Sequence, residues 1–266
     1  YNYFIKRSHS FLYKYNYNIK YWNNYFSKFF KDEKIKCLLS THLENESYFG
    51  VVEKLIKKKI PIFSFQHGHG REIRFLPSFE KYHYIFEPLA DVTFCFNKRS
   101  KNKSESVNKI SRKKFINAGI PSVYKKNIVL FKNPKHKIIF LSCCVFSGIT
   151  RSQLALTKWS DKRVFELELS LIKKVFKKIP IKILYKIYPT IGNITENTIK
   201  KEIKNSNIDL VEKNYDASYF FYTKRIIITY GASSQLGWAL FSGLPLIFIN
   251  ISHQPVQSWL KKKLKS

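Results

Sequence analysis

Two histidines and two glycines follow a short apolar run, and these residue types can do more chemistry than any other short stretch of the chain. The imidazole of His67 has an ordinary pKa of about 6.5, which suits removal of a proton from an attacking hydroxyl at neutral pH. Gly68 and Gly70 permit backbone conformations closed to other residues and let a ligand approach the main chain. We predict a general base at His67; the alternative is a strand-ending turn with a structural histidine. The residues assigned to this loop are Gln66, His67, Gly68, His69, Gly70 and Arg71.

A second segment, residues 229–247, has the pattern of a strand, a turn of small residues, a short helix and another strand. Ser233 or Ser234 is predicted to be the N-cap of that helix. The N–H groups and the dipole at a helix N-terminus bind anions, so the segment is suited to hold a phosphate. The alternative is that the two serines only cap their helix.

A third segment, residues 185–190, contains Lys186 and Tyr188 at the end of a predicted strand. Lys186 can meet a phosphate as a point charge, although an ordinary surface lysine has the same sequence signature.

Several motifs are absent from the sequence. It has no DxD pair, no GxxxxGK[ST] loop and no GxGxxG after its first strand, which argues against a catalytic divalent ion, a P-loop enzyme and a dinucleotide enzyme. No carboxylate or cysteine accompanies the two histidines at ligand spacing, so no metal site is predicted.

The elements that must position these residues alternate regularly between short apolar strands and helices, which is typical of parallel α/β sheets. In the first half the predicted strands are residues 36–40, 60–65, 92–96 and 114–117, and the predicted helix is 44–59. In the second half the predicted strands are residues 137–141, 181–185, 208–211, 225–229 and 244–250. The predicted helices there are residues 161–178, 196–205, 215–222, 234–242 and 255–264.

The alternation is lost over residues 122–136 and then restarts, which predicts two domains, 1–133 and 134–266. Aromatic residues at helical spacing within residues 1–33 predict a leading amphipathic helix. We expect this helix to pack on the first domain; contact with a membrane surface is the alternative.

Composition limits the function classes. The 266 residues contain 48 Lys+Arg and 18 Asp+Glu, giving a formal charge of 48 − 18 = +30, which favours an acidic partner: nucleic acid, anionic lipid or a phosphorylated substrate. The 44% hydrophobic content excludes a disordered chain, and the longest apolar run, residues 244–251, has the length of a strand and not of a membrane span. Four cysteines without a CxxC pair indicate a reducing cytosol. The sequence begins at Tyr1 without any Met, so a preceding segment is not excluded.

Together the three segments resemble the GT-B glycosyltransferase superfamily. The resemblance is strongest to the CDP-glycerol glycerophosphotransferases and the capsule polysaccharide (Kdo- and sialyl-type) transferases of bacterial surface-polymer synthesis. The QHG strand end of those families is matched by Gln66-His67-Gly68, and their GxP segment by Gly119-Ile120-Pro121. Their K-x-HP strand end is matched by Lys186-Ile187-Tyr188-Pro189, and their donor-phosphate segment by Ser233-Ser234, Ala239 and Gly243-Leu244-Pro245. Tyr188 stands where the family usually has His, and Trp238 where it usually has Glu.

The resemblance implies two Rossmann-like domains whose parallel sheets face a central cleft, with the acceptor on the N-terminal half and the donor on the C-terminal half. It implies metal-independent transfer of a glycosyl or polyol-phosphate group from a CMP-, CDP-, UDP- or GDP-linked donor to a surface polysaccharide or lipid-linked acceptor, without a cofactor. His67 is then the catalytic base, and the donor-binding residues are Lys186, Tyr188, Ser233, Ser234 and Trp238.

The implied location is the cytoplasm, with peripheral contact at the anionic inner face of the membrane. Two alternatives stay open: a non-catalytic basic protein that binds nucleic acid or anionic lipid, and a degenerate transferase. Nucleic acid is disfavoured as a partner because the aromatic residues fall mostly on predicted core faces, and because no RRM, KH or helix-turn-helix pattern is present.

Overall fold

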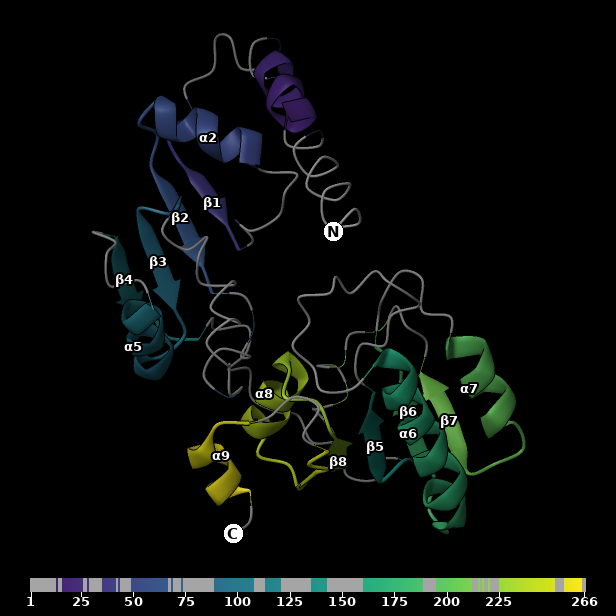
Figure 1. Cartoon of the computed structure of the whole chain (residues 1–266). Coiled ribbons are helices and arrows are strands. Elements are labelled where there is room, and N and C mark those ends of the chain that lie inside the picture. The colour runs from purple at the N-terminus through teal and green to yellow at the C-terminus, as the bar shows by residue number, and fades with distance from the viewer. Residues whose placement is uncertain are drawn as a thin grey trace, which may run out of the picture. The chain divides into compact units, whose positions relative to one another are not determined.

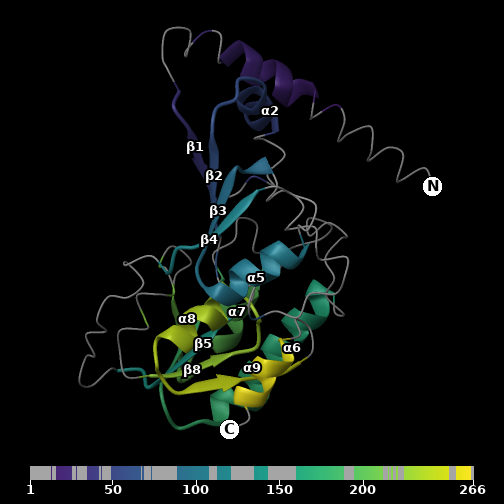
Figure 2. The same ribbon diagram turned by 90° about the vertical axis from the view of Figure 1, so that its left-hand side faces the viewer.

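The chain forms two compact units, each built on one parallel sheet (Figures 1 and 2). Unit 1 comprises Tyr1–His67 with Pro77–Lys125, and unit 2 comprises Gly68–Leu76 with Lys126–Ser266. The structure is a computed structural model. It describes residues 13, 16–25, 28, 35–41, 43, 49–66, 68, 73, 89–107, 113–120, 135–142, 160–188, 195–211, 215, 217, 220, 225–251 and 256–264.

The sheet of unit 1 has four parallel strands in the order β1-β2-β3-β4, so neighbours in the sequence are neighbours in the sheet (Figure 2). The strands are β1 (Leu38–Ser40), β2 (Ile62–Phe65), β3 (Val92–Cys95) and β4 (Lys114–Asn117). Asp91, just before β3, accepts hydrogen bonds from the Ile62 N–H at 2.8 Å and from Lys113 at 2.9 Å. These donors, the Ile62 N–H first, hold the pKa of Asp91 below its ordinary value and tie the amino ends of β2, β3 and β4 together.

The predicted leading helix is confirmed for residues 16–25, which are helical and lie beside α2 (Phe49–Lys57) in both views (Figures 1 and 2). Trp22 packs against the apolar cluster under β2. Gly50 allows the close approach, because a Cβ there would lie 2.9 Å from the carbonyl oxygen of Asn18. The expectation that this helix packs on the first domain is therefore correct.

The helix α5 (Lys98–Val107) was not predicted, because its sequence KRSKNKSESV has no apolar stripe. Polar contacts hold it instead. The side chain of Asn97 accepts a hydrogen bond from the Ser100 N–H at 2.9 Å, as an N-cap does. Ser100 and Ser104 are fully buried, so α5 packs on β3 and β4 through serines.

The sheet of unit 2 has five parallel strands in the order β7-β6-β5-β8-β9; the one crossover leads from the edge strand β7 to β8, on the other side of the central β5. The strands are β5 (Ile138–Leu141), β6 (Ile183–Lys186), β7 (Ile208–Val211), β8 (Ile226–Thr229) and β9 (Leu246–Phe248). The helices are α6 (Asp161–Lys174), the one-turn η6 (Phe176–Lys178), α7 (Thr195–Ile203), α8 (Ser234–Phe241) and α9 (Ser258–Lys263). All the strands predicted for this half are present, shifted by two residues or fewer at either end. The helix predicted at 215–222 lies largely outside the described residues.

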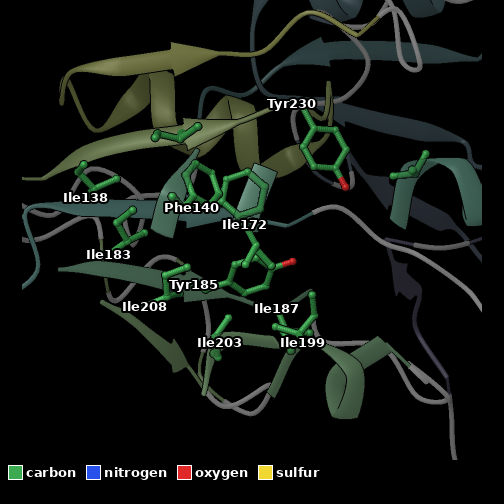
Figure 3. Close-up of a cluster of buried hydrophobic side chains, with 13 residues drawn as sticks. Ile138, Phe140, Ile172, Ile183, Tyr185, Ile187, Ile199, Ile203, Ile208 and Tyr230 are labelled. Carbon is green, nitrogen blue, oxygen red and sulfur yellow. The ribbon is translucent and has the colours of Figure 1, made fainter. Parts of the chain in front are cut away.

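Both faces of this sheet are covered by helices. One face forms a cluster with α6 and α7, in which the ring of Phe140 packs on those of Tyr185 and Tyr230 with centroids 5.1 and 6.1 Å apart (Figure 3). The other face packs Leu141 and Ile227 against Ala239 of α8. Two Rossmann-like units confirm the predicted fold class; that their sheets face a common cleft stays a prediction. Among the described residues, no helix combines the length and the apolar character that a bilayer crossing requires.

Candidate functional site

The N-terminus of α8 lies at the carboxyl edge of the second sheet, directly after β8. Ser233 is its N-cap, with extended backbone angles (φ −110°, ψ −175°), and its Oγ accepts a hydrogen bond from the Gln235 N–H at 3.3 Å. The prediction that one of the two serines caps this helix is confirmed, and Ser234 is the first helical residue. The Gln235 N–H is used by this cap, and the Leu236 N–H donates to the Ser233 carbonyl oxygen, so this end of α8 offers an anion the Ser234 N–H and the positive end of the helix dipole.

The backbone of Gly68 lies against this same helix end. A Cβ at position 68 would come within 2.1 Å of Ser234 Oγ and 3.2 Å of Ser234 Cβ, and Gly68 has a left-handed φ of +64°, so both the space and the backbone favour glycine there. The segment is anchored further along by Ile73, which is 3% exposed in a cluster with Leu236 of α8. The carbonyl oxygen of Ile73 accepts a hydrogen bond from the Gln257 N–H at 2.8 Å. Gly68–Leu76 is accordingly part of unit 2, an association that the sequence did not predict.

Lys186 is fully buried at the carboxyl end of β6, where Nζ donates a hydrogen bond to the carbonyl oxygen of Ile187 at 2.7 Å. The interpretation of Lys186 as an ordinary surface lysine is therefore wrong. The strand register places it beside Leu141, which in turn lies beside Thr229 of β8. Since side chains alternate along a strand, Lys186 faces the same side of the sheet as Leu184 and hence as α8. Tyr188 follows two residues later and is half-buried.

Gln235, in the first turn of α8, is a candidate ligand-binding residue that sequence reasoning missed. Its side chain is 7% exposed, and its Oε1 has no hydrogen-bond partner among the described residues. A buried acceptor without a donor is costly, so such a group in a native fold calls for an explanation, a bound ligand being one. Its position directly after Ser233 and Ser234, at the start of an apolar helix, gave no sequence signal. Trp238, three residues on, is half-buried and packs against the apolar cluster beneath α8.

In unit 1, Gln66 directly follows β2, and its side-chain oxygen accepts two hydrogen bonds. Its Oε1 accepts hydrogen bonds from the Phe96 N–H at 2.9 Å and from Ser100 Oγ at 2.6 Å, and the residue is 2% exposed. Gln66 thus fixes the end of β2 against β3 and α5. The other residues of the predicted loop, His67, His69, Gly70 and Arg71, lie outside the described residues, and their roles stay predictions.

Within the part of the chain that the structure describes, no group of three His, Cys, Asp or Glu side chains is arranged to hold a metal ion. The groups at the carboxyl ends of β6 and β8 are donors and a cation: the N-terminus of α8, two serine hydroxyls and the buried ammonium of Lys186. Such an arrangement is suited to bind phosphate groups, as ligands of open α/β sheets bind outside the carboxyl ends of the strands.

Fold and site together define a class: an α/β protein of two Rossmann-like units, the architecture of the GT-B class. Among solved structures, the chain is similar to UDP-N-acetylglucosamine 2-epimerase from Rickettsia bellii, with a TM-score of 0.53 and 16% sequence identity over 90% of this chain and 62% of that one. It also aligns with a crystal structure of UDP-N-acetylglucosamine 2-epimerase (TM-score 0.47, 14% identity, 89% of this chain and 60% of that one). A third match is Acinetobacter baumannii MurG (TM-score 0.41, 10% identity, 85% and 57%).

The chain spans less than two thirds of the length of each of these proteins. No protein-family model matches the sequence, and no curated protein matches it. At these identities the likeness to the Rickettsia bellii structure shows a shared fold, and the function has to be argued from the site.

Proposed function

We propose that this chain belongs to an enzyme that uses a nucleotide-activated sugar or polyol donor. The reaction is transfer of the glycosyl or polyol-phosphate group to a surface polysaccharide or lipid-linked acceptor. The observation that carries the proposal is the Ser233-capped N-terminus of α8 at the sheet's carboxyl edge, with the backbone of Gly68 packed against it. A glycine backbone beside a helix N-terminus is a recurrent way to bind a diphosphate.

In this proposal unit 2 binds the donor. The Ser234 N–H at the start of α8 and the hydroxyl of Ser234 bind the donor phosphates, and Lys186 supplies a positive charge. Gln235 Oε1 accepts a hydrogen bond from a hydroxyl or N–H group of the donor, which satisfies its otherwise unpartnered oxygen. Tyr188 and Trp238 contribute half-buried aromatic rings at the same edge.

The proposed chemistry is a single displacement. The acceptor hydroxyl oxygen attacks the anomeric carbon, or the phosphorus of a polyol-phosphate donor, and the bond to the leaving phosphate oxygen breaks. His67, which directly precedes Gly68 in the sequence, takes the proton of the hydroxyl. Negative charge that develops on the leaving phosphate meets the N-terminus of α8 and Lys186, so the reaction draws on protein groups and no added cofactor.

The test is Ser234→Pro, measured by calorimetric titration with CMP, CDP, UDP and GDP. Proline is well tolerated as the first residue of a helix, and the extended backbone of Ser233 suits a residue before proline, so α8 should keep its fold. The substitution removes both the N–H and the hydroxyl of Ser234 from the proposed phosphate site. Asp161→Pro is the matched control, because Asp161 is the first residue of α6 and also follows a capping serine with extended backbone angles, Ser160.

We expect one nucleotide to bind the wild-type chain, and its affinity to fall in Ser234→Pro but not in Asp161→Pro. Equal affinities in all three proteins would remove α8 from the site. A wild-type chain that binds none of the four nucleotides would refute the proposed function.

We also propose peripheral contact with an anionic membrane, at which a lipid-linked acceptor would be met. Tyr13, Tyr17 and Tyr21 recur every four residues along the leading helix and are 50–74% exposed. Residues 1–31 contain six Lys or Arg and no Asp or Glu. Aromatic rings with lysines suit the headgroup region of a bilayer. If the wild-type chain binds phosphatidylglycerol vesicles and the double variant Tyr17→Ser/Tyr21→Ser does not, the contact is supported. If the wild type and the double variant bind vesicles equally well, and bind single-stranded DNA as tightly as vesicles, the contact is refuted.

A further inference from the structure

A buried carboxylate lies within the second sheet's core, next to the strands that lead into the candidate site. Glu168 belongs to α6 and is 1% exposed. It occupies the middle of a buried stripe at four-residue spacing, between Val164 (1% exposed) and Ile172 (0%). A helix facing an apolar sheet normally carries apolar side chains at all such positions, so a glutamate there has a specific role in this fold.

Three hydroxyl groups from three adjacent strands donate hydrogen bonds to this carboxylate. Ser142 Oγ lies 2.7 Å from Oε1, and the Tyr185 hydroxyl lies 2.5 Å from Oε2. The Tyr230 hydroxyl also donates to Oε1. Figure 3 shows the hydroxyl oxygens of Tyr185 and Tyr230 on the side of the cluster away from Ile138 and Ile183, which begin their strands. The carboxylate therefore gathers donors at the carboxyl ends of β5, β6 and β8.

Each of the three donors is next to a segment of the candidate site. Tyr185 directly precedes Lys186, and Tyr230 directly precedes the turn that leads to Ser233. Ser142 follows β5, and its N–H donates to the carbonyl oxygen of Lys186 at 3.0 Å. A single side chain of α6 is thus hydrogen-bonded at the ends of β5, β6 and β8, and β6 and β8 lead to Lys186 and to α8.

We propose that Glu168 is a positioning residue for the donor site. It sets the spacing of the ends of β5, β6 and β8, and through them the geometry in which Lys186 and the N-terminus of α8 meet a nucleoside diphosphate. The inference rests on the proposed function for the identity of the ligand. The mechanical part, that Glu168 orders the start of α8, stands on the hydrogen bonds alone. Charge-assisted hydrogen bonds are among the stronger ones, and they impose a defined geometry on buried groups.

The variants are Glu168→Gln, Tyr185→Phe and Tyr230→Phe. Gln replaces one acceptor oxygen by an NH₂ group that cannot accept a hydrogen bond, and each Phe removes one donor while keeping the ring. Asn207→Ala is the matched control. The side chain of Asn207 also makes three hydrogen bonds, two half-buried ones to the carbonyl oxygens of Phe176 and Ile179 and an exposed one to that of Ile181, but at the amino edge of the same sheet.

Two readouts are measured in each variant. The first is the Kd for the nucleoside diphosphate that the wild-type chain binds best, by calorimetry well below Tm. The second is amide hydrogen exchange of Leu236 and Gly237, whose N–H groups bond to the carbonyl oxygen of Ser233, and of Ser142. We expect Kd to rise about fivefold or more in Tyr185→Phe and Tyr230→Phe, the scale of one hydrogen bond, and exchange at these amides to accelerate. Asn207→Ala should lower Tm while leaving Kd and these amides unchanged.

Each result decides the inference. If Kd and the α8 exchange rates change in proportion to Tm in all four variants, Glu168 only stabilises the core and the inference is overturned. The inference is also overturned if Kd and the exchange rates stay unchanged when the hydrogen bonds to Glu168 are removed. If Glu168→Gln does not fold, the two Tyr→Phe variants give the same comparison. A wild-type chain that binds no nucleoside diphosphate overturns the proposed function, and the exchange rates then decide by themselves whether Glu168 orders α8.

Discussion

Replacing Gly68 with alanine places a methyl group 2.1 Å from Ser234 Oγ and 3.2 Å from Ser234 Cβ. The substitution also forces a residue with a Cβ to adopt a φ of +64°. The left-handed conformation costs a non-glycine residue about 1–2 kcal/mol. Overpacking adds about 1–3 kcal/mol, because the segment is held in place by the buried Ile73 and cannot move away freely. We therefore expect Gly68→Ala to lower the free energy of unfolding by about 2–5 kcal/mol.

Gly243→Ala separates the two contributions. Gly243 has a nearly identical φ of +65°, but a Cβ there would meet nothing within 4 Å. It should therefore lose only the conformational part, about 1–2 kcal/mol. The gain from restricting the unfolded chain is similar for both Gly→Ala changes and cancels in the comparison. The remaining difference between the two variants measures the contact with Ser234.

The assay is urea unfolding of both variants, together with nucleotide titration. Gly68→Ala should weaken nucleotide binding, because the methyl group displaces the N-terminus of α8, whereas Gly243→Ala should leave binding unchanged. In Gly68→Ala/Ser234→Ala the oxygen at 2.1 Å is absent, so the double variant should recover part of the lost stability, with a coupling energy of about 0.5–3 kcal/mol. Equal destabilisation by the two single variants, with no coupling to Ser234, would refute the close approach.

Three further outcomes are expected. Lys186→Met keeps the apolar stem and removes a buried charge, so Tm should stay level or rise. The Kd for the nucleotide should increase about 10- to 150-fold, the equivalent of one charge-assisted hydrogen bond. A lower Tm with an unchanged Kd would show that Lys186 has only a structural role. The pKa of Asp91 is lowered in the folded state, so its contribution to folding stability is present above an unfolded pKa of about 3.9 and is lost as pH falls through the folded pKa. The difference in unfolding free energy between wild type and Asp91→Asn should therefore shrink from pH 7 to pH 2. A difference that stays constant over this range would contradict the prediction. Trp22→Ala should lower the free energy of unfolding by less than the about 3–5 kcal/mol typical of a fully buried Trp, because Trp22 is half-buried against the cluster of unit 1. The urea midpoint should still fall clearly. An unchanged midpoint would show that the leading helix does not pack on that core.

The sequence by itself determined the features that depend on local patterns. Short apolar runs between amphipathic stretches predicted the strands of both sheets, because a buried parallel strand has no polar face. The N-cap of α8 followed from Ser233 and Ser234, because capping involves only the next few residues of the same chain. The helix α5 was not predicted because its sequence has no apolar periodicity. It is held by the N-cap Asn97 and by the hydrogen bond of Ser100 to Gln66, a residue distant in the sequence.

Only the tertiary structure decided how the site is assembled. Lys and Glu are residue types that usually lie on the surface, yet Lys186 and Glu168 are both buried, because the fold supplies partners for their polar atoms. Lys186 donates a hydrogen bond to the carbonyl oxygen of Ile187, and Glu168 accepts hydrogen bonds from three hydroxyl groups at strand ends. Gly68 joins unit 2 through contact with Ser234, a residue far away in the chain. Such contacts are invisible to sequence periodicity, because a local pattern specifies which face of an element is apolar but not which distant residue lies against it.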